Sequence, residues 1–383
     1  MRVIELNLEL KAGACKTAAA INRTKQAARR INPRLEGGIE NVAGTGDFKG
    51  FRVAESTIAF SQEIELGNKR RHRTTAAETG VAVSRELETA RLSELLLDVR
   101  RAVLKVLAVQ AKVTLAEETL ALVRETEAIA RSHELAGKTT PLETGRASTE
   151  TARAVLALQD RQAEQKDAIR ELALCWGETE PTFDAVAGLL DTQTAKLPAL
   201  STLLIQAKSN PLLLVADAQT RAFEAKIRTE EAERLPNLEI AAGVRRFEEA
   251  DGFGFVAGVG IDLPLFNRNR DAVRAAAADA ESARLEAAAI RLKNESTLRR
   301  LHARLKTLSE KNASLRDTII PASESTLAFV KQSHEQGKAG YLDVLDARRT
   351  VVETRMDVIN ASVEYHACQI EIDQICSSSP ATP

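Results

Sequence analysis

The sequence predicts a mainly α-helical protein with a small β part, in which one structural unit is used twice. Three observations predict this fold class. Two runs of alternating residues flank a glycine-rich turn, long stretches carry apolar residues at heptad spacing, and both patterns recur about 200 residues apart. Each unit should therefore hold a β-hairpin followed by a long α-helical hairpin.

The clearest β-hairpin is expected in the second half of the chain. Alternate residues from Phe253 to Leu265 are apolar, and the preceding run at 238–245 alternates in the same way. Period two is typical of strands with one apolar face, and the turn at 248–252 makes the two runs a hairpin. The apolar face of its second strand includes Phe255, Val259 and Ile261.

The two repeats are expected at residues 1–197 and 198–376, with a disordered tail at 377–383. The first repeat should contain a short N-terminal helix at 16–31, strands at about 34–44 and 52–66, and helices at about 68–136 and 142–176. The second should contain a helix at about 200–234, strands at about 236–247 and 253–266, and helices at about 268–336 and 341–375. Asn68 and Asn267 are expected to cap the long helices, and Pro321 to kink the second one.

Both long helices carry an apolar seam at spacings of three, four or seven residues. The first seam is Leu92, Leu96, Val99, Val103, Val106, Val113 and Leu120, and the second is Leu298, Leu301, Leu305, Leu308 and Leu315. At 1.5 Å per residue the first helix would be roughly 100 Å long. Neither helix can fold back over a sheet of four short strands.

Composition excludes several classes of protein. Only 3% of the 383 residues are aromatic, which is too few large side chains for conventional globular cores, whereas 28% charged residues suit long helices. The net charge of −1 argues against nucleic-acid binding. No apolar run reaches 18 residues, so no transmembrane helix is expected.

The N-terminus and the cysteines give few signals. No signal peptide is visible, which indicates a misplaced start or a trimmed chain; Ala12–Cys15 faintly resembles a lipoprotein cleavage site, but charged residues precede it. No C-x-x-C pair occurs, so a structural zinc site is disfavoured. Cys175 and Cys376 lie near the ends of equivalent returning helices, which leaves both a disulfide and free thiols open.

Two short motifs imitate nucleotide sites without the required context. Gly137-Lys138-Thr139 resembles the end of a P-loop but follows a helix, and the glycines from Gly252 open a strand, not a helix. No cofactor site and no nucleophile–base constellation is visible, so the chain is not expected to be an enzyme.

The strands indicate assembly from several chains. Four amphipathic strands cannot form an open sheet in lipid, because hydrocarbon leaves the backbone groups of the edge strands unpaired. In water one face would still lack a cover. Closure by several chains solves both problems, with the strands in one barrel and the helices in a helical tube. Strands of about 9–14 residues suit the roughly 9–11 that a tilted membrane strand needs.

Four motifs in a fixed order resemble the TolC-type outer-membrane efflux factors. They are Pro236-Asn237-Leu238, the run 263–270, the run 337–349, and in the first half the run 61–70, which is most similar to the cobalt-zinc-cadmium branch of the family. The resemblance covers about residues 17–376. It implies a homotrimer with a 12-stranded outer-membrane β-barrel in contact with lipid and a periplasmic α-helical barrel. It also implies a periplasmic adaptor and an inner-membrane pump as partners.

The resemblance assigns roles to several residues. Asp343 and Asp346 match family aspartates that form acidic rings at the closed periplasmic end, although they could instead complement the dipole of the helix that they begin. The turns at the helix tips would contact the adaptor through Gly137, Leu142, Gly337, Tyr341 and Leu342.

Two histidines lie near the two predicted turns. His133 and His334 are candidate metal ligands in view of the branch resemblance, or simply polar residues at exposed helix ends. The family's gating Tyr and Arg positions hold His334 and Ala339, so its gate bonds do not carry over intact.

The expected function is the outer-membrane channel of a tripartite efflux system, a passive duct for heavy-metal cations that extends into the periplasm. Export of drugs or other small molecules is the first alternative. A periplasmic adaptor would lack the duplicated unit, and a structural coiled-coil protein would leave the strands unexplained. Nucleic acid is not an expected partner.

Overall fold

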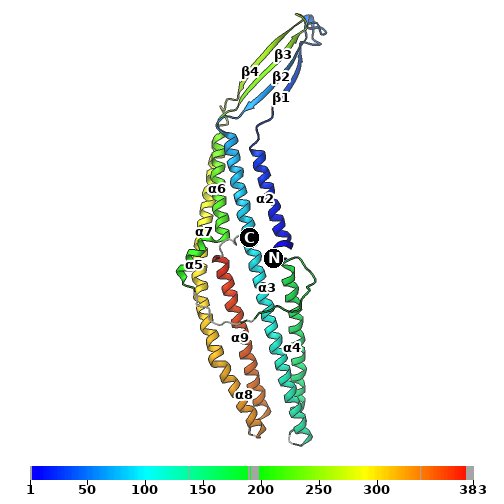
Figure 1. The fold of residues 1–383 in the computed structure, drawn as a ribbon, viewed down its shortest axis with the longest axis vertical. Coiled ribbons are helices and arrows are strands. Elements are labelled where there is room, and N and C mark those ends of the chain that lie inside the picture. Colours follow the sequence, from blue (N-terminus) through cyan, green and yellow to red (C-terminus); the bar gives the residue numbers. More distant parts are fainter. Residues whose placement is uncertain (1, 138, 189, 191–197, 337, 377–383) are drawn as a thin grey trace. The chain divides into compact units, whose positions relative to one another are not determined.

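The computed structural model describes residues 2–137, 139–188, 190, 198–336 and 338–376. The helices are α1 (Arg2–Leu6), α2 (Leu8–Ala27), α3 (Lys69–Leu135), α4 (Pro141–Leu174), α5 (Leu200–Gln206), α6 (Pro211–Ala232), α7 (Arg270–Ser314), α8 (Ile320–Glu335) and α9 (Tyr341–Cys376) (Figure 1). The strands are β1 (Arg34–Glu40), β2 (Glu55–Ile64), β3 (Leu238–Phe247) and β4 (Gly252–Ile261). The tail predicted at 377–383 lies outside the described residues.

The chain forms two compact units. One comprises Met1–Lys11, Thr89–Pro211 and Arg291–Pro383, and the other comprises Ala12–Glu88 and Leu212–Ile290. The sequence repeat divides the chain at 197/198 instead, so each compact unit combines segments of both repeats, and α3 and α7 contribute to both units.

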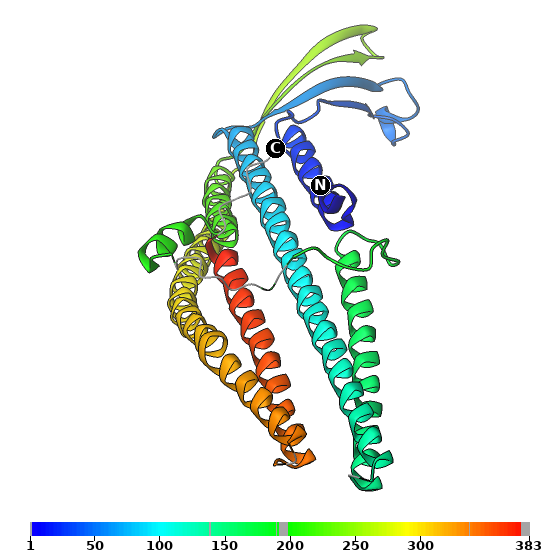
Figure 2. The same cartoon turned by 60° about the horizontal axis from the view of Figure 1, so that its bottom comes forward.

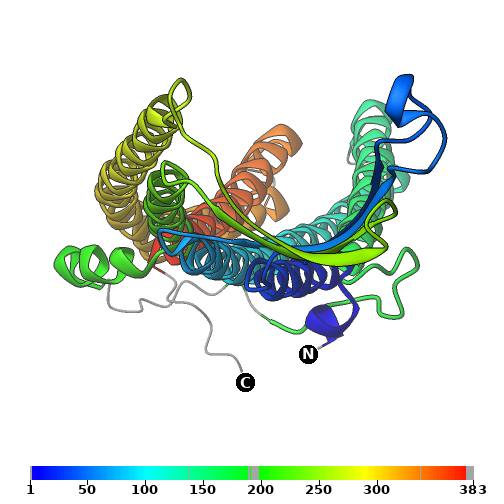
Figure 3. The same ribbon diagram turned by 90° about the horizontal axis from the view of Figure 1, so that it is seen from above.

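The unit with the strands contains one antiparallel sheet in the order β1-β2-β3-β4, and the strands lie side by side with a clear curvature in Figure 3. Ile58 lies opposite Val244, and Val244 lies opposite Phe255, so one face is apolar across neighbouring strands. The exposed side chains of this face are Leu35, Ile39, Ile58, Phe60, Ile64, Ile240, Val244, Phe253, Phe255, Val259 and Ile261. Glu55, Thr57 and Arg245 lie on the other face, where the guanidinium of Arg245 donates 2.8 Å bonds to both partners. The sheet is therefore amphipathic, with Gln62 and Arg246 as polar residues on its apolar face.

Gly243 allows close approach of β3 to β2. A Cβ atom there would lie 2.5 Å from the carbonyl oxygen of Ile58 and 2.9 Å from Cβ of Ala59. We expect Gly243→Ala to lower the free energy of unfolding by about 1–3 kcal/mol, because the backbone of β2 must shift. Urea unfolding in lipid vesicles measures the loss. Gly258→Ala is the matched control, since its nearest neighbour would be Cβ of Ala241 at 3.9 Å; equal losses in both variants would contradict the explanation.

Several helices differ from the sequence prediction. The helix predicted to begin at residue 16 begins earlier, as α2 at Leu8, and the short helix α1 precedes it. Oδ1 of Asn7 starts α2, because it accepts hydrogen bonds from the amides of Glu9 (2.9 Å) and Leu10 (3.1 Å). Its end moves from residue 31 to Ala27, whose carbonyl accepts a 3.0 Å bond from Nε of Arg73.

The single helix predicted at 200–234 is also wrong. It is broken into α5, a 3₁₀ turn at Ala207–Ser209, and α6. Pro211 has no amide hydrogen to continue the helix. The Asn210 side chain instead donates to the carbonyls of Gln374 (3.1 Å) and Ile375 (3.2 Å), which caps the end of α9.

The helix predicted at 268–336 begins two residues later and is interrupted. Asn269, with φ of 51°, directly precedes α7, while Oδ1 of Asn267 accepts a bond from the Asn269 amide. A π-helical turn at Leu315–Ile319 separates α7 from α8. Pro321 lies in the first turn of α8. Because proline has no amide hydrogen, it cannot form the regular helical hydrogen bond, and this accounts for the irregular π-helical turn before it.

All four strands are shorter than predicted. β1 stops at Glu40 because Asn41 and Ala43 adopt positive φ, and β2 starts at Glu55, not 52. β4 stops at Ile261, and Pro264 explains why no strand continues to 266.

In the other unit, α3 pairs with α4, and α7 and α8 pair with α9 (Figure 2). Each pair has its own apolar seam. Val106 and Val113 pack with Ile169 and Leu172 between α3 and α4. The second seam joins Leu298, Leu301, Leu305, Leu308, Tyr365, Cys368, Ile372 and Ile375. Among the helices of the described ranges, none combines the length and hydropathy needed to cross a membrane.

The four cysteines are free thiols, so the disulfide considered for Cys175 and Cys376 is not formed. Burial, and secondarily the charge of Asp373, raises the pKa of Cys376 to about 11. Below that pH its alkylation rate should rise about tenfold per pH unit, because only the thiolate reacts. Exposed Cys15 is the internal control. Maleimide labelling followed by peptide mass mapping checks this; labelling of Cys376 as fast as that of Cys15 at pH 7 would contradict it.

Candidate functional site at the hairpin turns

The turns of the α3/α4 and α8/α9 hairpins lie at the same end of their unit (Figures 1 and 2). The first turn reverses at Gly137, whose φ of 69° favours glycine and whose amide donates to the carbonyl of Glu134 at 2.9 Å. Gly337, predicted to act in the second turn, lies outside the described residues. Leu142 and Leu342, at equivalent positions of the two repeats, are 61% and 59% exposed. The turns thus present an apolar side chain each.

Tyr341 lies inside this end of the unit. It is 4% exposed and packs with Ala130 of α3 and Ala147 of α4. Burial raises its pKa, and its hydroxyl has no hydrogen-bond partner among the described residues. Tyr341 therefore holds the two hairpins together, and it does not offer an adaptor the exposed surface that the sequence suggested.

Asp343 and Asp346 are both exposed on the first turns of α9. Oδ2 of Asp343 accepts a 2.8 Å hydrogen bond from the amide of Gly340, which caps the helix. The Asp346 carboxylate forms no ion pair within the described part of the chain. Asp343 thus caps the helix that it begins, and it keeps the negative charge that the dipole alternative requires.

The structure brings His133 and His334 together, although they come from different hairpins. Their ring centroids are 6.4 Å apart. Nδ1 of His334 is 2.9 Å from the carbonyl oxygen of Ala339, which in the neutral ring leaves Nε2 as an acceptor. Both rings line a cavity of about 160 Å³ with Glu143. Among the described residues, however, no group of three or more His, Cys, Asp or Glu side chains could hold a metal ion.

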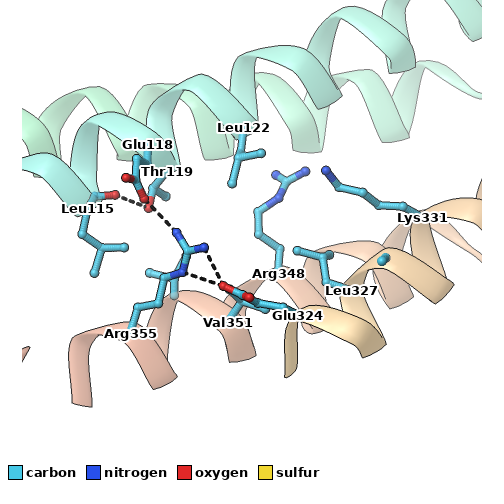
Figure 4. Close-up of a pocket in the computed structure, with 12 residues that line it drawn as sticks. Leu115, Glu118, Thr119, Leu122, Glu324, Leu327, Lys331, Arg348, Val351 and Arg355 are labelled. Carbon is cyan, nitrogen blue, oxygen red and sulfur yellow. Dashed lines mark hydrogen bonds and ion pairs between the residues drawn. The ribbon is translucent and has the colours of Figure 1, made fainter. Parts of the chain in front are cut away.

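A second cavity, of about 260 Å³, lies between α3, α8 and α9 (Figure 4). Arg355 of α9 connects the hairpins there: Nη1 donates to Glu118 of α3 at 2.8 Å, and Nη2 donates to Glu324 of α8 at 2.6 Å. Arg348, also on α9, is 4% exposed, and burial lowers its pKa.

Sequence reasoning missed both arginines. A signal for Arg348 was present, since Tyr341, Val344, Arg348 and Val351 follow spacings of three, four and three and all are buried. Burial of an arginine in an apolar seam costs free energy unless its charge has a partner. Arg348 could therefore have been predicted from the sequence as a candidate functional residue.

Comparison with known proteins assigns the chain to a family. The family model described as "Outer membrane efflux protein" matches residues 2–178 and 205–376. The chain belongs to the outer membrane efflux protein family. The resemblance found in the sequence motifs is thereby confirmed.

The relatives include metal-resistance proteins. The chain is 30% identical over 373 residues to the cobalt-zinc-cadmium resistance protein CzcC of Cupriavidus metallidurans, covering 96% of this chain and 86% of CzcC. It is 28% identical over 293 residues to the nickel-cobalt-cadmium resistance protein NccC of Alcaligenes xylosoxydans xylosoxydans, covering 73% and 64% of the two chains. The crystal structure of CusC, described in terms of transmembrane channel formation, superposes with a TM-score of 0.82 at 18% identity, covering 98% and 90%. The fold is that of the TolC-like channels, as the sequence predicted.

Proposed function

We propose that the chain is the outer-membrane channel of a tripartite efflux system and that it provides a passive exit for heavy-metal cations. The observation that carries this proposal is the four-stranded sheet, one face of which carries exposed apolar side chains on every strand. Within the described residues β1 and β4 each pair on one side only, so both edges are open to neighbours. Three copies would close a 12-stranded barrel in the outer membrane, with Phe255, Val259 and Ile261 facing lipid.

The helical hairpins support the rest of the proposal. In this assembly they form the periplasmic α-barrel, and the exposed Leu142 and Leu342 contact the periplasmic adaptor. The energy for transport comes from an inner-membrane pump. The cargo is assigned from the metal-resistance relatives, and drug export is the alternative.

Asp343 and Asp346 are proposed to line the periplasmic constriction. Their carboxylates are exposed in the single chain, and the amide of Gly340 donates to the carboxylate of Asp343. Three copies would bring six carboxylates close together, which attracts cations.

Deletion of the gene, with the cognate pump and adaptor kept, tests the cargo. The deletion strain should lose resistance to Co²⁺, Zn²⁺ or Cd²⁺ and keep its resistance to hydrophobic drugs. Loss of drug resistance alone would favour the alternative. Extraction of outer membranes with detergent should yield a trimer, and recovery of the full-length precursor product as a soluble monomer would contradict the channel.

A further inference from the structure

The cavity between α3, α8 and α9 has apolar walls and three basic residues. Leu115 and Leu122 of α3, Leu327 of α8 and Val351 of α9 form the walls, and Lys331, Arg348 and Arg355 bring positive charge. Two carboxylates, Glu118 and Glu324, also line it. Basic side chains therefore exceed acidic ones in this space by one.

Arg355 engages both carboxylates. Its Nη1 binds Glu118 at 2.8 Å, and its Nε and Nη2 bind Glu324 at 3.2 and 2.6 Å. In Figure 4 the dashed lines from Glu118 and Glu324 end on Arg355, and none reaches Arg348. Both acidic side chains of the cavity thus bind Arg355 and not Arg348.

Arg348 is left with unused donors. It is 4% exposed, and its Nη2 donates to Oγ1 of Thr126, while Nε and Nη1 have no hydrogen-bond partner among the described residues. Glu125 and Glu150 act on its charge through space without bonding to it. Buried guanidinium groups normally have their donors paired, because an unpaired buried charge is expensive.

Lys331 extends the same basic site. In Figure 4 the ammonium of Lys331, from α8, and the guanidinium of Arg348, from α9, point toward one another. The two cations share a cavity whose two carboxylates are bonded to Arg355. An anion between them would accept a hydrogen bond from an unused donor of Arg348 and balance the two positive charges.

We propose that this cavity binds a small oxyanion, of the phosphate, sulfate or carboxylate class, between Arg348 and Lys331. Nη1 of Arg348, which has no hydrogen-bond partner among the described residues, can donate to one oxygen of such an anion, and the ammonium of Lys331 can bind another as a point charge. The cavity of about 260 Å³ has room for the anion. Because α8 and α9 supply the cations and α3 supplies Thr126, the bound anion would stabilise the contact of the two hairpins. The site lies outside the proposed transport of cations and does not depend on it.

Equilibrium dialysis of the full chain, purified in detergent, against radiolabelled inorganic phosphate at constant ionic strength tests the proposal. The wild type should bind one phosphate per chain saturably, and acetate should compete. Arg348→Gln should weaken binding at least about tenfold, since a charge-assisted bond from the buried guanidinium is lost. Lys331→Gln should weaken it less. Arg349→Gln is the matched control, because Arg349 is the exposed neighbour of Arg348 on α9 and should bind phosphate as the wild type does.

Absence of saturable phosphate binding by the wild type would overturn the proposal, and it is also the result expected if a carboxylate of another protein chain fills the cavity. An equal loss of binding in Arg349→Gln and Arg348→Gln would overturn it as well. Should Arg348→Gln fail to fold, Lys331→Gln decides: unchanged phosphate affinity in that variant contradicts the site.

Discussion

Replacement of Val259 by arginine is expected to lower the free energy of unfolding in lipid by about 2–4 kcal/mol and to reduce the yield of assembled protein sharply. Val259 lies on β4 opposite Ile240 and is 74% exposed on the apolar face. If this face contacts lipid near mid-membrane, a guanidinium there loses its water and finds no counterion. Urea titration of protein folded in vesicles measures the effect.

Val256→Arg is the matched control. Val256 precedes Val259 by three residues on the same strand, lies opposite Gly243, and belongs to the other face of the sheet. If that face lines a water-filled channel, the arginine remains hydrated, and the variant should assemble with a much smaller loss. Equal stability of the two variants, or a larger loss in Val256→Arg, would mean that the lipid-facing side has been assigned wrongly.

The fold was predictable because its signals are periodic and local. Period two places Phe255, Val259 and Ile261 on one face, where the structure also has them. The second helical seam was predicted equally well, since the side chains of Leu298 and Leu301 are almost completely buried. In the first seam, Leu96 is 36% exposed while Val106 is fully buried. A straight helix drifts relative to a strict heptad, so one end of a long seam can leave the core.

The motifs that resembled the family have a physical basis at the junction of strands and helices. Lys69, at the start of α3, is 5% exposed, and its ammonium binds Asn237 at 2.7 Å and Glu233 at 3.2 Å. Arg73 pairs with Glu65 through both terminal nitrogens, and this bonding raises the pKa of Arg73. Lys69 and Asn237 are 168 positions apart in sequence, so their motifs could be recognised but the bond between them could not be derived. Arg73 and Glu65 are only eight positions apart.

The interruptions of the helices and the basic cavity could not be predicted either, because they also depend on contacts between residues far apart in sequence. Asn210 ends a helix by binding carbonyls of α9, which is far away in sequence. His133 and His334 could be placed at two turns, yet their proximity depends on how the hairpins pack. The unused donors of Arg348 are visible only once Glu118 and Glu324 are seen to bind Arg355.

Neutralising Asp343 and Asp346 together should weaken the cation selectivity of the channel and its block by divalent cations about tenfold, because a ring of carboxylates concentrates cations. The substitution of choice is Asn at both positions. Asp343→Ala would also remove the acceptor for the Gly340 amide and cost a helix cap, whereas Asp343→Asn keeps a side-chain oxygen there. Single-channel recording in planar bilayers compares the double variant with the wild type.

A charge-matched control separates the ring from a general change of net charge. Asp271 and Asp279 of α7 belong to the unit that holds the strands, and both are exposed, so Asp271→Asn combined with Asp279→Asn removes the same two charges elsewhere. That control should conduct like the wild type. If the Asp343 and Asp346 variant kept the same ion selectivity and the same sensitivity to divalent cations, the two carboxylates would not line the pore, and helix capping would be the whole role of Asp343.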